Sequence, residues 1–223
     1  VRLVWKRWST APAHAWQRYA FEVLLPNVVG RELMASAYLI CQLRLVVFLK
    51  QTGLEPQQCF QGLRLERGNT LHEDDLLKRG FTVVLGNPPY SGLSQNMAPE
   101  LRAQVQPYLY LNGQRLPEKK TWLQDDYVKF MRLAQRCIEC TSVGISCLVT
   151  PNSWLDTPTF RGMRANLLST FQATWFLDLH GNSLRDDRAV DGAPDPNIFG
   201  IRQGVAVHFM VRDGSTQAAF HCG

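Results

Sequence analysis

A short apolar stretch that ends in a stiff polar tip is the part of this sequence with the clearest chemical meaning. Phe81–Leu85 has the residue types of a buried strand, and Gly86 with the two prolines that follow it ends the strand abruptly. The prolines hold Asn87 and Tyr90 at the carboxyl end of this strand. In open α/β sheets that end is where ligands bind. The stretch therefore predicts a ligand site that presents an amide and an aromatic ring.

A second polar side chain is expected at the end of an earlier strand. Asn27–Glu32 indicates a short strand that ends in an acid, and residues 33–51 have the apolar spacing of a helix that Gly53 closes. A strand, an acid and a helix in this order can bind the ribose of a nucleotide-type cofactor, because a carboxylate accepts from two vicinal hydroxyls. Glu32 could equally be an acid that the helix dipole favours.

A third candidate follows the next expected strand. Phe60–Glu66 is a plausible strand in which Leu63 and Leu65 alternate with polar residues, and Asn69 follows three residues after its end. The amide of Asn69 could bind a purine edge, or the residue could simply form a turn.

The remaining elements continue the alternation of helix and strand. Helices are expected over 125–140 and 160–169, and strands over 143–149, 174–179 and 204–211. This order predicts an α/β fold with a mostly parallel sheet covered by helices. His180 follows the strand expected over 174–179 and is expected to be a packed or hydrogen-bonded loop residue.

The connection over 91–121 is long and polar, with Lys119, Lys120 and Trp122 near its end. Connections of this length inside a compact domain are usually functional. Basic and aromatic residues here suit a loop that closes over a flipped base or a DNA backbone, and a solvated loop is the equally weighted alternative.

Composition sets the broad class of the protein. The 223 residues are 45% hydrophobic and 19% charged, and the net charge is +5, which indicates a globular chain with a mild preference for polyanionic partners. The sequence has no apolar run of membrane-spanning length and no signal-peptide pattern. The six cysteines include one close pair, Cys137 and Cys140, without a partner pair, so reduced thiols and no metal site are expected.

Three segments are predicted along the chain. Residues 1–15 are basic and aromatic, and form either a nucleic-acid-binding arm or frayed terminal structure. Residues 16–212 are expected to be the main domain, and 213–223 a frayed tail.

Trp16 to Arg212 resembles the methyltransferase part of large bacterial restriction–modification enzymes. The similarity is greatest to the single-polypeptide type ISP enzymes, in which an adenine-N6 DNA methyltransferase is fused to a helicase-like translocase. The residues that carry it are Leu25–Leu33, Leu85–Gly92, Trp122–Phe130, Pro158–Arg164, Leu177–Asn182, and Asn197–Phe199 with Gly204–Ala206.

The resemblance implies a Rossmann-like sheet, mostly parallel with an antiparallel final strand, and S-adenosylmethionine as cofactor. Glu32 and Gly30 match the residues that hold the ribose of the cofactor, and Asn69 matches the residue beside its adenine. Asn87 matches a residue that contacts both the cofactor and the target base. The implied partners are double-stranded DNA and the nuclease, translocase and target-recognition parts of a larger polypeptide. The implied location is the bacterial cytoplasm.

The resemblance also assigns the chemistry of the tip, Asn87, Pro88, Pro89 and Tyr90. The Asn87 side-chain oxygen and the Pro88 carbonyl each accept one hydrogen of the adenine amine, which stabilises the positive charge that develops on nitrogen. The prolines fix these acceptors in advance. Tyr90 stacks on a base that must first leave the duplex, with Phe199 as a second stacking residue.

One departure from the family lies upstream of Glu32, where residues 1–15 contain no glycine-rich turn. The first strand of the sheet is therefore expected to be absent, and this chain alone is expected to bind the cofactor poorly and to methylate little. Robust methylation of duplex DNA by the purified chain would contradict that expectation. A non-catalytic DNA-binding remnant and a protein glutamine methyltransferase are the alternative functions.

Overall fold

The computed structural model describes residues 1–72, 74–90, 92, 94–117, 121–185, 187–189, 191–215 and 219–222. The chain forms two compact units, Val1–His72 (unit 1) and Glu73–Gly223 (unit 2), and each is described by itself. The boundary lies inside the segment 16–212 that the sequence predicts as one methyltransferase domain, so that domain assignment stays a prediction.

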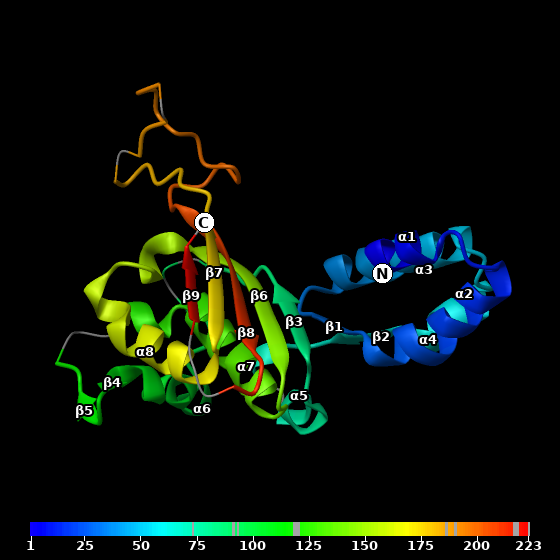
Figure 1. The fold of residues 1–223 in the computed structure, drawn as a ribbon, viewed down its shortest axis with the longest axis horizontal. Coiled ribbons are helices and arrows are strands. Elements are labelled where there is room, and N and C mark those ends of the chain that lie inside the picture. Colours follow the sequence, from blue (N-terminus) through cyan, green and yellow to red (C-terminus); the bar gives the residue numbers. More distant parts are fainter. Residues whose placement is uncertain are drawn as a thin grey trace. The chain divides into compact units, whose positions relative to one another are not determined.

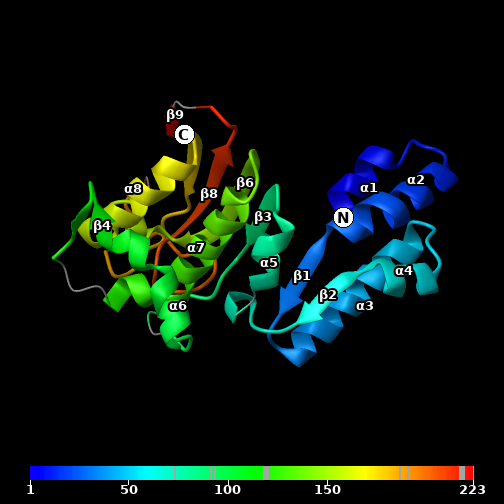
Figure 2. The same ribbon diagram turned by 90° about the horizontal axis from the view of Figure 1, so that it is seen from below.

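Unit 1 is a two-stranded parallel sheet with helices packed on it (Figures 1 and 2). Strand β1 pairs in parallel with β2, with Gly30 opposite Leu65 and Glu32 opposite Arg67. The elements in order are α1 (Arg2–Trp8), α2 (Ala13–Tyr19), η1 (Ala20–Leu24), η2 (Leu25–Asn27), β1 (Val29–Glu32), α3 (Ala35–Gln51), α4 (Pro56–Gly62), β2 (Arg64–Arg67) and η3 (Thr70–His72). The strand ending at Glu32 and the helix that follows it therefore form as expected.

The basic aromatic N-terminal segment is packed, and the expectation of frayed structure there is wrong. Trp5 lies 5.0 Å from the buried Trp16 between ring centroids, and Trp8 stacks on Tyr19 at 4.5 Å. Both tryptophans pack against the apolar core of unit 1. Aromatic pairs of this kind add to the burial of large rings, which explains why four aromatic residues are so close together in the sequence.

The strand expected over Phe60–Glu66 is shorter and begins later. Residues Pro56–Gly62 form helix α4 instead, and β2 covers only Arg64–Arg67. Pro56 occupies the first turn of α4, where its missing N–H costs nothing, and the Gln58 side chain accepts a hydrogen bond from the Glu55 N–H at 3.1 Å. These capping interactions outweigh the weak alternation that suggested a strand.

Unit 2 is built on a five-stranded sheet of order β3-β6-β8-β7-β9 (Figure 1). Strands β3, β6, β7 and β9 run in one direction, and β8 is antiparallel to both of its neighbours. The elements are α5 (Asp74–Arg79), β3 (Val83–Gly86), α6 (Pro99–Gln104), η4 (Gln106–Leu109), β4 (Tyr110–Leu111), β5 (Gln114–Arg115), η5 (Thr121–Gln124), α7 (Asp126–Glu139), β6 (Gly144–Pro151), η6 (Asn152–Trp154), η7 (Pro158–Phe160), α8 (Arg161–Thr170), β7 (Ala173–Asp178), β8 (Val205–Arg212) and β9 (Ala219–Cys222).

The mostly parallel α/β sheet with an antiparallel strand confirms the predicted fold class. The antiparallel strand is not the last one, because Ala219–Cys222 form β9 beside β7. The expectation that all of 213–223 is a frayed tail is therefore wrong for these four residues. Their backbone groups extend the sheet by one more parallel ladder.

Helices α7 and α8 cover one face of this sheet (Figure 2). Leu148 of β6 and Met210 of β8 point into the same core as Met131 of α7 and Leu167 of α8. This core holds β3 and β6 in register, with Gly86 opposite Leu148. The carboxyl ends of these two parallel strands therefore lie side by side.

The connection over 91–121 has more regular structure than the loop that the sequence predicts. It contains helix α6, turn η4 and the β4–β5 hairpin. Asn112 and Gly113 form the hairpin turn with φ of 52° and 77°, which is the backbone that two-residue hairpins need and that Asn-Gly supplies. The Asn-Gly pair was thus a hairpin signal.

His208 on β8 couples the stability of unit 2 to pH. Its side chain is 1% exposed and its ring meets Trp154 edge-on at 5.5 Å. Burial lowers the pKa of His208 to about 3. The unfolded chain protonates near the ordinary histidine pKa, so it binds more protons than the folded chain between the two values, and stability falls as pH falls.

We expect the free energy of unfolding to drop by about 2 kcal/mol between pH 7.5 and pH 5.0 through this residue. In His208→Met the ring that titrates is absent, so most of that loss should disappear. Urea denaturation of both proteins at the two pH values measures the difference. Equal pH dependence in the two proteins would contradict the assignment.

Candidate functional site

Glu32 lies at the carboxyl end of β1, directly before helix α3. Its Oε1 accepts a hydrogen bond from the Met34 N–H at 2.8 Å, and Met34 is the residue that caps α3. The contact lies before the first turn of α3, which contains no acidic residue, so the interpretation of Glu32 as a helix acid stays a prediction. This contact uses one carboxylate oxygen, so the residue still fits a ribose diol as an acceptor.

Asn69 lies just beyond the neighbouring strand β2 and forms a turn there. Its Oδ1 accepts from the Leu71 N–H at 3.0 Å, and its backbone oxygen accepts from the His72 N–H at 3.1 Å. Because β1 and β2 are parallel, Glu32 and Asn69 follow strands that end at the same edge of the unit 1 sheet. Asn69 therefore forms a turn, and it also lies just after the end of strand β2, as expected.

The packing of β1 on β2 requires a glycine at position 30, independently of the predicted role of Gly30 in cofactor binding. A Cβ at this position would come within 2.6 Å of Leu65 Cδ2 on β2. The glycine lets the two strands of unit 1 pack closely. Its contact with a cofactor stays a prediction.

The tip Asn87–Tyr90 follows β3 in unit 2, at the carboxyl edge of the five-stranded sheet. Asn87 and Pro89 are exposed, Pro88 is buried, and Tyr90 is half-buried against the core of unit 2. Burial raises the pKa of Tyr90, so its hydroxyl stays protonated. An exposed amide on a backbone anchored by a buried proline suits an acceptor that is presented to a ligand.

A cavity of about 250 Å³ lies at the carboxyl end of β6, the strand beside β3. Trp122 lines this cavity, and 58% of its surface is exposed. A Cβ on Gly92, two residues after the tip, would lie 3.7 Å from the Trp122 ring. The lining residues are Trp122, Asp125, Tyr127, Pro151, Asn152, Ser153, Thr157, Phe160, Asn182, Leu184, Arg185, Gln203 and Gly204.

Asn152 and Gly204 shape the floor of this cavity, and sequence reasoning assigned neither a role in the site. The Asn152 N–H donates to the Gly204 oxygen at 2.9 Å, and Asn152 Nδ2 donates to Asp178 Oδ1 at 3.1 Å. A Cβ on Gly204 would lie 2.5 Å from Asn152 Nδ2. The position of Asn152 directly after a strand was the signal that could have identified it, as it was for Asn87.

The first turn of α7 is a second feature that the sequence did not reveal. Asp125, Asp126 and Lys129 are all buried and bind the chain that follows the tip. Helical periodicity indicated only that this helix packs on the sheet. Charged residues inside that apolar pattern were the available signal.

The remaining predicted substrate residues are separate from the cavity or outside the described residues. Phe199 is 48% exposed in the loop before β8, and its N–H donates to Asn197 Oδ1 at 2.8 Å. It is not among the described residues that line the cavity. Lys119 and Lys120 lie outside the described residues. Their roles in DNA binding stay predictions.

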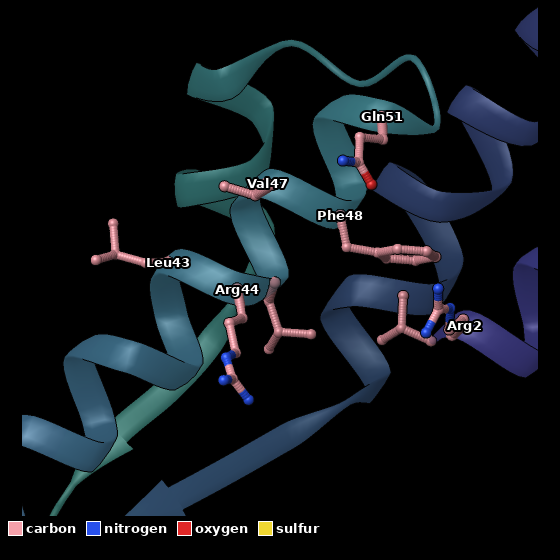
Figure 3. Close-up of a pocket in the computed structure, with 8 residues that line it drawn as sticks. Arg2, Leu43, Arg44, Val47, Phe48 and Gln51 are labelled. Carbon is pink, nitrogen blue, oxygen red and sulfur yellow. The ribbon is translucent and has the colours of Figure 1, made fainter.

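A wider cleft, of about 510 Å³, lies in unit 1 between α1 and α3 (Figure 3). Phe48, Val47 and Leu43 give it an apolar wall, with Arg2 and Arg44 beside them. Glu32 and Asn69, the predicted site residues of this unit, are not among its described lining residues.

Two classes of site find no support in the described part of the chain. Its residues include no group of three or more His, Cys, Asp or Glu side chains that could hold a metal ion. None of its helices has the length and apolar character needed to cross a membrane.

Comparison with known proteins gives one family and several similar folds. The family described as "Eco57I restriction-modification methylase" matches residues 26–184. No curated protein matches the chain. Among solved structures, the ATP-dependent Type ISP restriction-modification enzyme LlaBIII bound to DNA is 22% identical over 92% of this chain, with a TM-score of 0.73.

Two further structures have a similar fold. A nuclease-deletion mutant of the Type ISP enzyme LlaGI, in complex with a DNA substrate mimic, is 17% identical over 100% of the chain with a TM-score of 0.77. The DrdV–DNA complex is 23% identical over 86% of the chain with a TM-score of 0.70. The chain spans 15%, 22% and 20% of the lengths of LlaBIII, LlaGI and DrdV, respectively.

Proposed function

Because the chain belongs to the Eco57I restriction-modification methylase family, we propose that it is the methyl-transferring part of an adenine-N6 DNA methyltransferase in a restriction–modification system. The observation that carries the proposal is the exposed Asn87 amide on a proline-stiffened tip at the carboxyl end of β3. Double-stranded DNA is the proposed substrate. Nuclease, translocase and target-recognition parts of a larger polypeptide are the proposed partners.

S-adenosylmethionine is the proposed cofactor, and it supplies an electrophilic methyl group on a sulfonium when bound. In unit 1, Glu32 is assigned to the ribose hydroxyls and Asn69 to the neighbourhood of the adenine. The fit rests on the chemistry of the donor set, since a carboxylate and an amide at adjoining parallel strand ends suit a nucleoside.

The tip residues are proposed to make the adenine amine a better nucleophile. Asn87 Oδ1 and the Pro88 carbonyl each accept one N–H of that amine, which favours the positive charge developing on nitrogen during attack. Pro88 and Pro89 fix the backbone, so little entropy is lost when the base arrives. Tyr90 offers its ring face to the flipped base, and Trp122, at the cavity by the carboxyl end of β6, adds a second apolar surface.

The test is a transfer assay with the full-length protein, labelled S-adenosylmethionine and duplex DNA of mixed sequence. Digestion to nucleosides and mass spectrometry should find the label in N6-methyladenine. Label in a methylated cytosine or in a protein glutamine would contradict the proposal. DNA binding without cofactor binding would favour a non-catalytic remnant.

Glu32→Gln tests the cofactor assignment separately from the fold. The amide oxygen of glutamine can still accept from the Met34 N–H, so the turn between β1 and α3 should keep this hydrogen bond. The charge and one acceptor towards the ribose are lost, and we expect S-adenosylmethionine to bind about tenfold or more weakly in calorimetry. Glu22→Gln, an exposed change on η1, is the matched control and should leave the affinity unchanged.

A further inference from the structure

The chain that follows the catalytic tip is attached to the first turn of α7 at three alternate residues. The Gly92 N–H donates to Asp125 Oδ2 at 3.0 Å. Lys129 Nζ donates to Ser94 Oγ and to the Asn96 oxygen, both at 2.6 Å. Ser94 Oγ in turn donates to Asp126 Oδ1. We call Asp125, Asp126 and Lys129 the α7 anchor.

The α7 anchor is buried, which makes its charges costly unless they are paired. Lys129 is 0% exposed, and its Nζ lies 3.8 Å from Asp126 Oδ1. Burial lowers the pKa of Lys129, and the carboxylates of Asp126 and Asp125 oppose that effect. A buried ion pair contributes little stability compared with an apolar replacement of similar volume, and its best-attested use is to specify one arrangement.

The tip Asn87–Tyr90 needs neighbouring segments to fix its conformation, because its own residues offer few hydrogen-bond donors and few buried contacts. Pro88 and Pro89 have no N–H to donate, and Asn87 and Pro89 are exposed. Strand β3 fixes the tip on one side, through the pairing of Gly86 with Leu148. The contacts of residues 92, 94 and 96 with α7 fix it on the other.

We infer that Asp125 and Lys129 are positioning residues, which hold the segment after Tyr90 so that the Asn87 amide and the Pro88 carbonyl are aimed at the reacting amine. Asp125 also lines the cavity at β6, so the same side chain touches the chain of the tip and the space beside it. The catalytic half of this inference rests on the function proposed above.

A pair of variants at Asp125 separates the hydrogen bond from the charge. Asp125→Asn keeps an oxygen that can accept from the Gly92 N–H, whereas Asp125→Ala removes it. We expect amide hydrogen exchange in residues 87–96 to accelerate at least about tenfold in the alanine variant and to stay near wild type in the asparagine variant. Exchange in α7 and β6 should be unchanged in both.

The double variant Lys129→Met with Asp126→Asn tests the lysine without leaving an unpaired buried charge. Both charges leave the interior together, so the free energy of unfolding should stay close to that of the wild type. The donors to Ser94 and Asn96 are lost, so exchange in residues 87–96 should still accelerate. In the full-length protein, kcat should fall about tenfold to hundredfold while KM for S-adenosylmethionine is unchanged. Glu100→Gln, an exposed change on α6, is the control.

Unchanged exchange in residues 87–96, or equal acceleration throughout unit 2, would overturn the inference. A wild-type kcat in the stable double variant would also overturn the inference, because the α7 anchor would then have only a structural role. A wild-type protein that transfers no methyl group to DNA would defeat the proposed function instead, and the exchange measurement would still decide the positioning role.

Discussion

Asn87→Ala is expected to lower kcat for adenine methylation by about 10²- to 10³-fold, the loss typical when one preorganised group that stabilises developing charge is removed. The alanine cannot accept the amine hydrogen, so the positive charge on nitrogen loses one of its two proposed acceptors. The affinity for S-adenosylmethionine should change less than kcat does. Single-turnover methylation of duplex DNA with the full-length protein measures the chemical step directly.

The fold should tolerate this substitution, which makes the result interpretable. Asn87 is exposed, and the neighbouring attachment of the tip is through the buried Pro88. Gln95→Ala is the matched control, because it removes another exposed amide from the segment that follows the tip. A drop in kcat of the same size in both variants, or none in Asn87→Ala, would show that Asn87 has no special role.

The candidate site residues that the sequence singles out are those that interrupt a strong pattern. The apolar run before Asn87 stops at Gly86 and two prolines, and the structure ends β3 at Gly86. Glu32 likewise ends a strand before a long helix. Local rules fix such ends, since proline and glycine exclude most backbone conformations whatever the rest of the fold does.

The α7 anchor could not be identified in that way. Lys129 lies on α7 and bonds Ser94 and Asn96, more than 30 residues earlier in the chain. A lysine in an amphipathic helix is usually solvated, and only the tertiary fold determines that this one is buried. The cavity at β6 has the same origin, because its wall is assembled from η5, η6 and the loop before β8.

The hairpin and helix inside 91–121 were not predicted from the sequence, for a different reason. Their turn signals are local, but their stability depends on packing against helices that come later in the chain. The hairpin strand β4 and the turn η4 before it pack on α8, and α6 packs on α7. Tyr108 and Leu109 of η4 are buried in the core of unit 2 together with Met163 and Leu167 of α8. Polar composition suggested a loop, whereas four buried side chains decide the structure.

Gly162→Ala is expected to be among the most destabilising single substitutions in unit 2, by about 3 kcal/mol, as found when a packed interior is overfilled. Gly162 lies in the first turn of α8. A Cβ there would clash with the backbone oxygen of Tyr108 and come within 2.8 Å of that of Tyr110. Backbone carbonyls of η4 and β4 cannot swing aside as a side-chain end can, so the helix or the hairpin must move.

Urea denaturation followed by circular dichroism measures the loss, and amide exchange locates it. We expect the exchange of residues 106–115 to accelerate more than that of β6, since the clash falls on η4 and the hairpin. Ser169→Ala, at an exposed position of the same helix, should change stability by only about 0.5 kcal/mol. If Gly162→Ala left both stability and exchange unchanged, the close packing of α8 on this segment would be wrong, and the connection after the tip Asn87–Tyr90 would not be a folded part of unit 2.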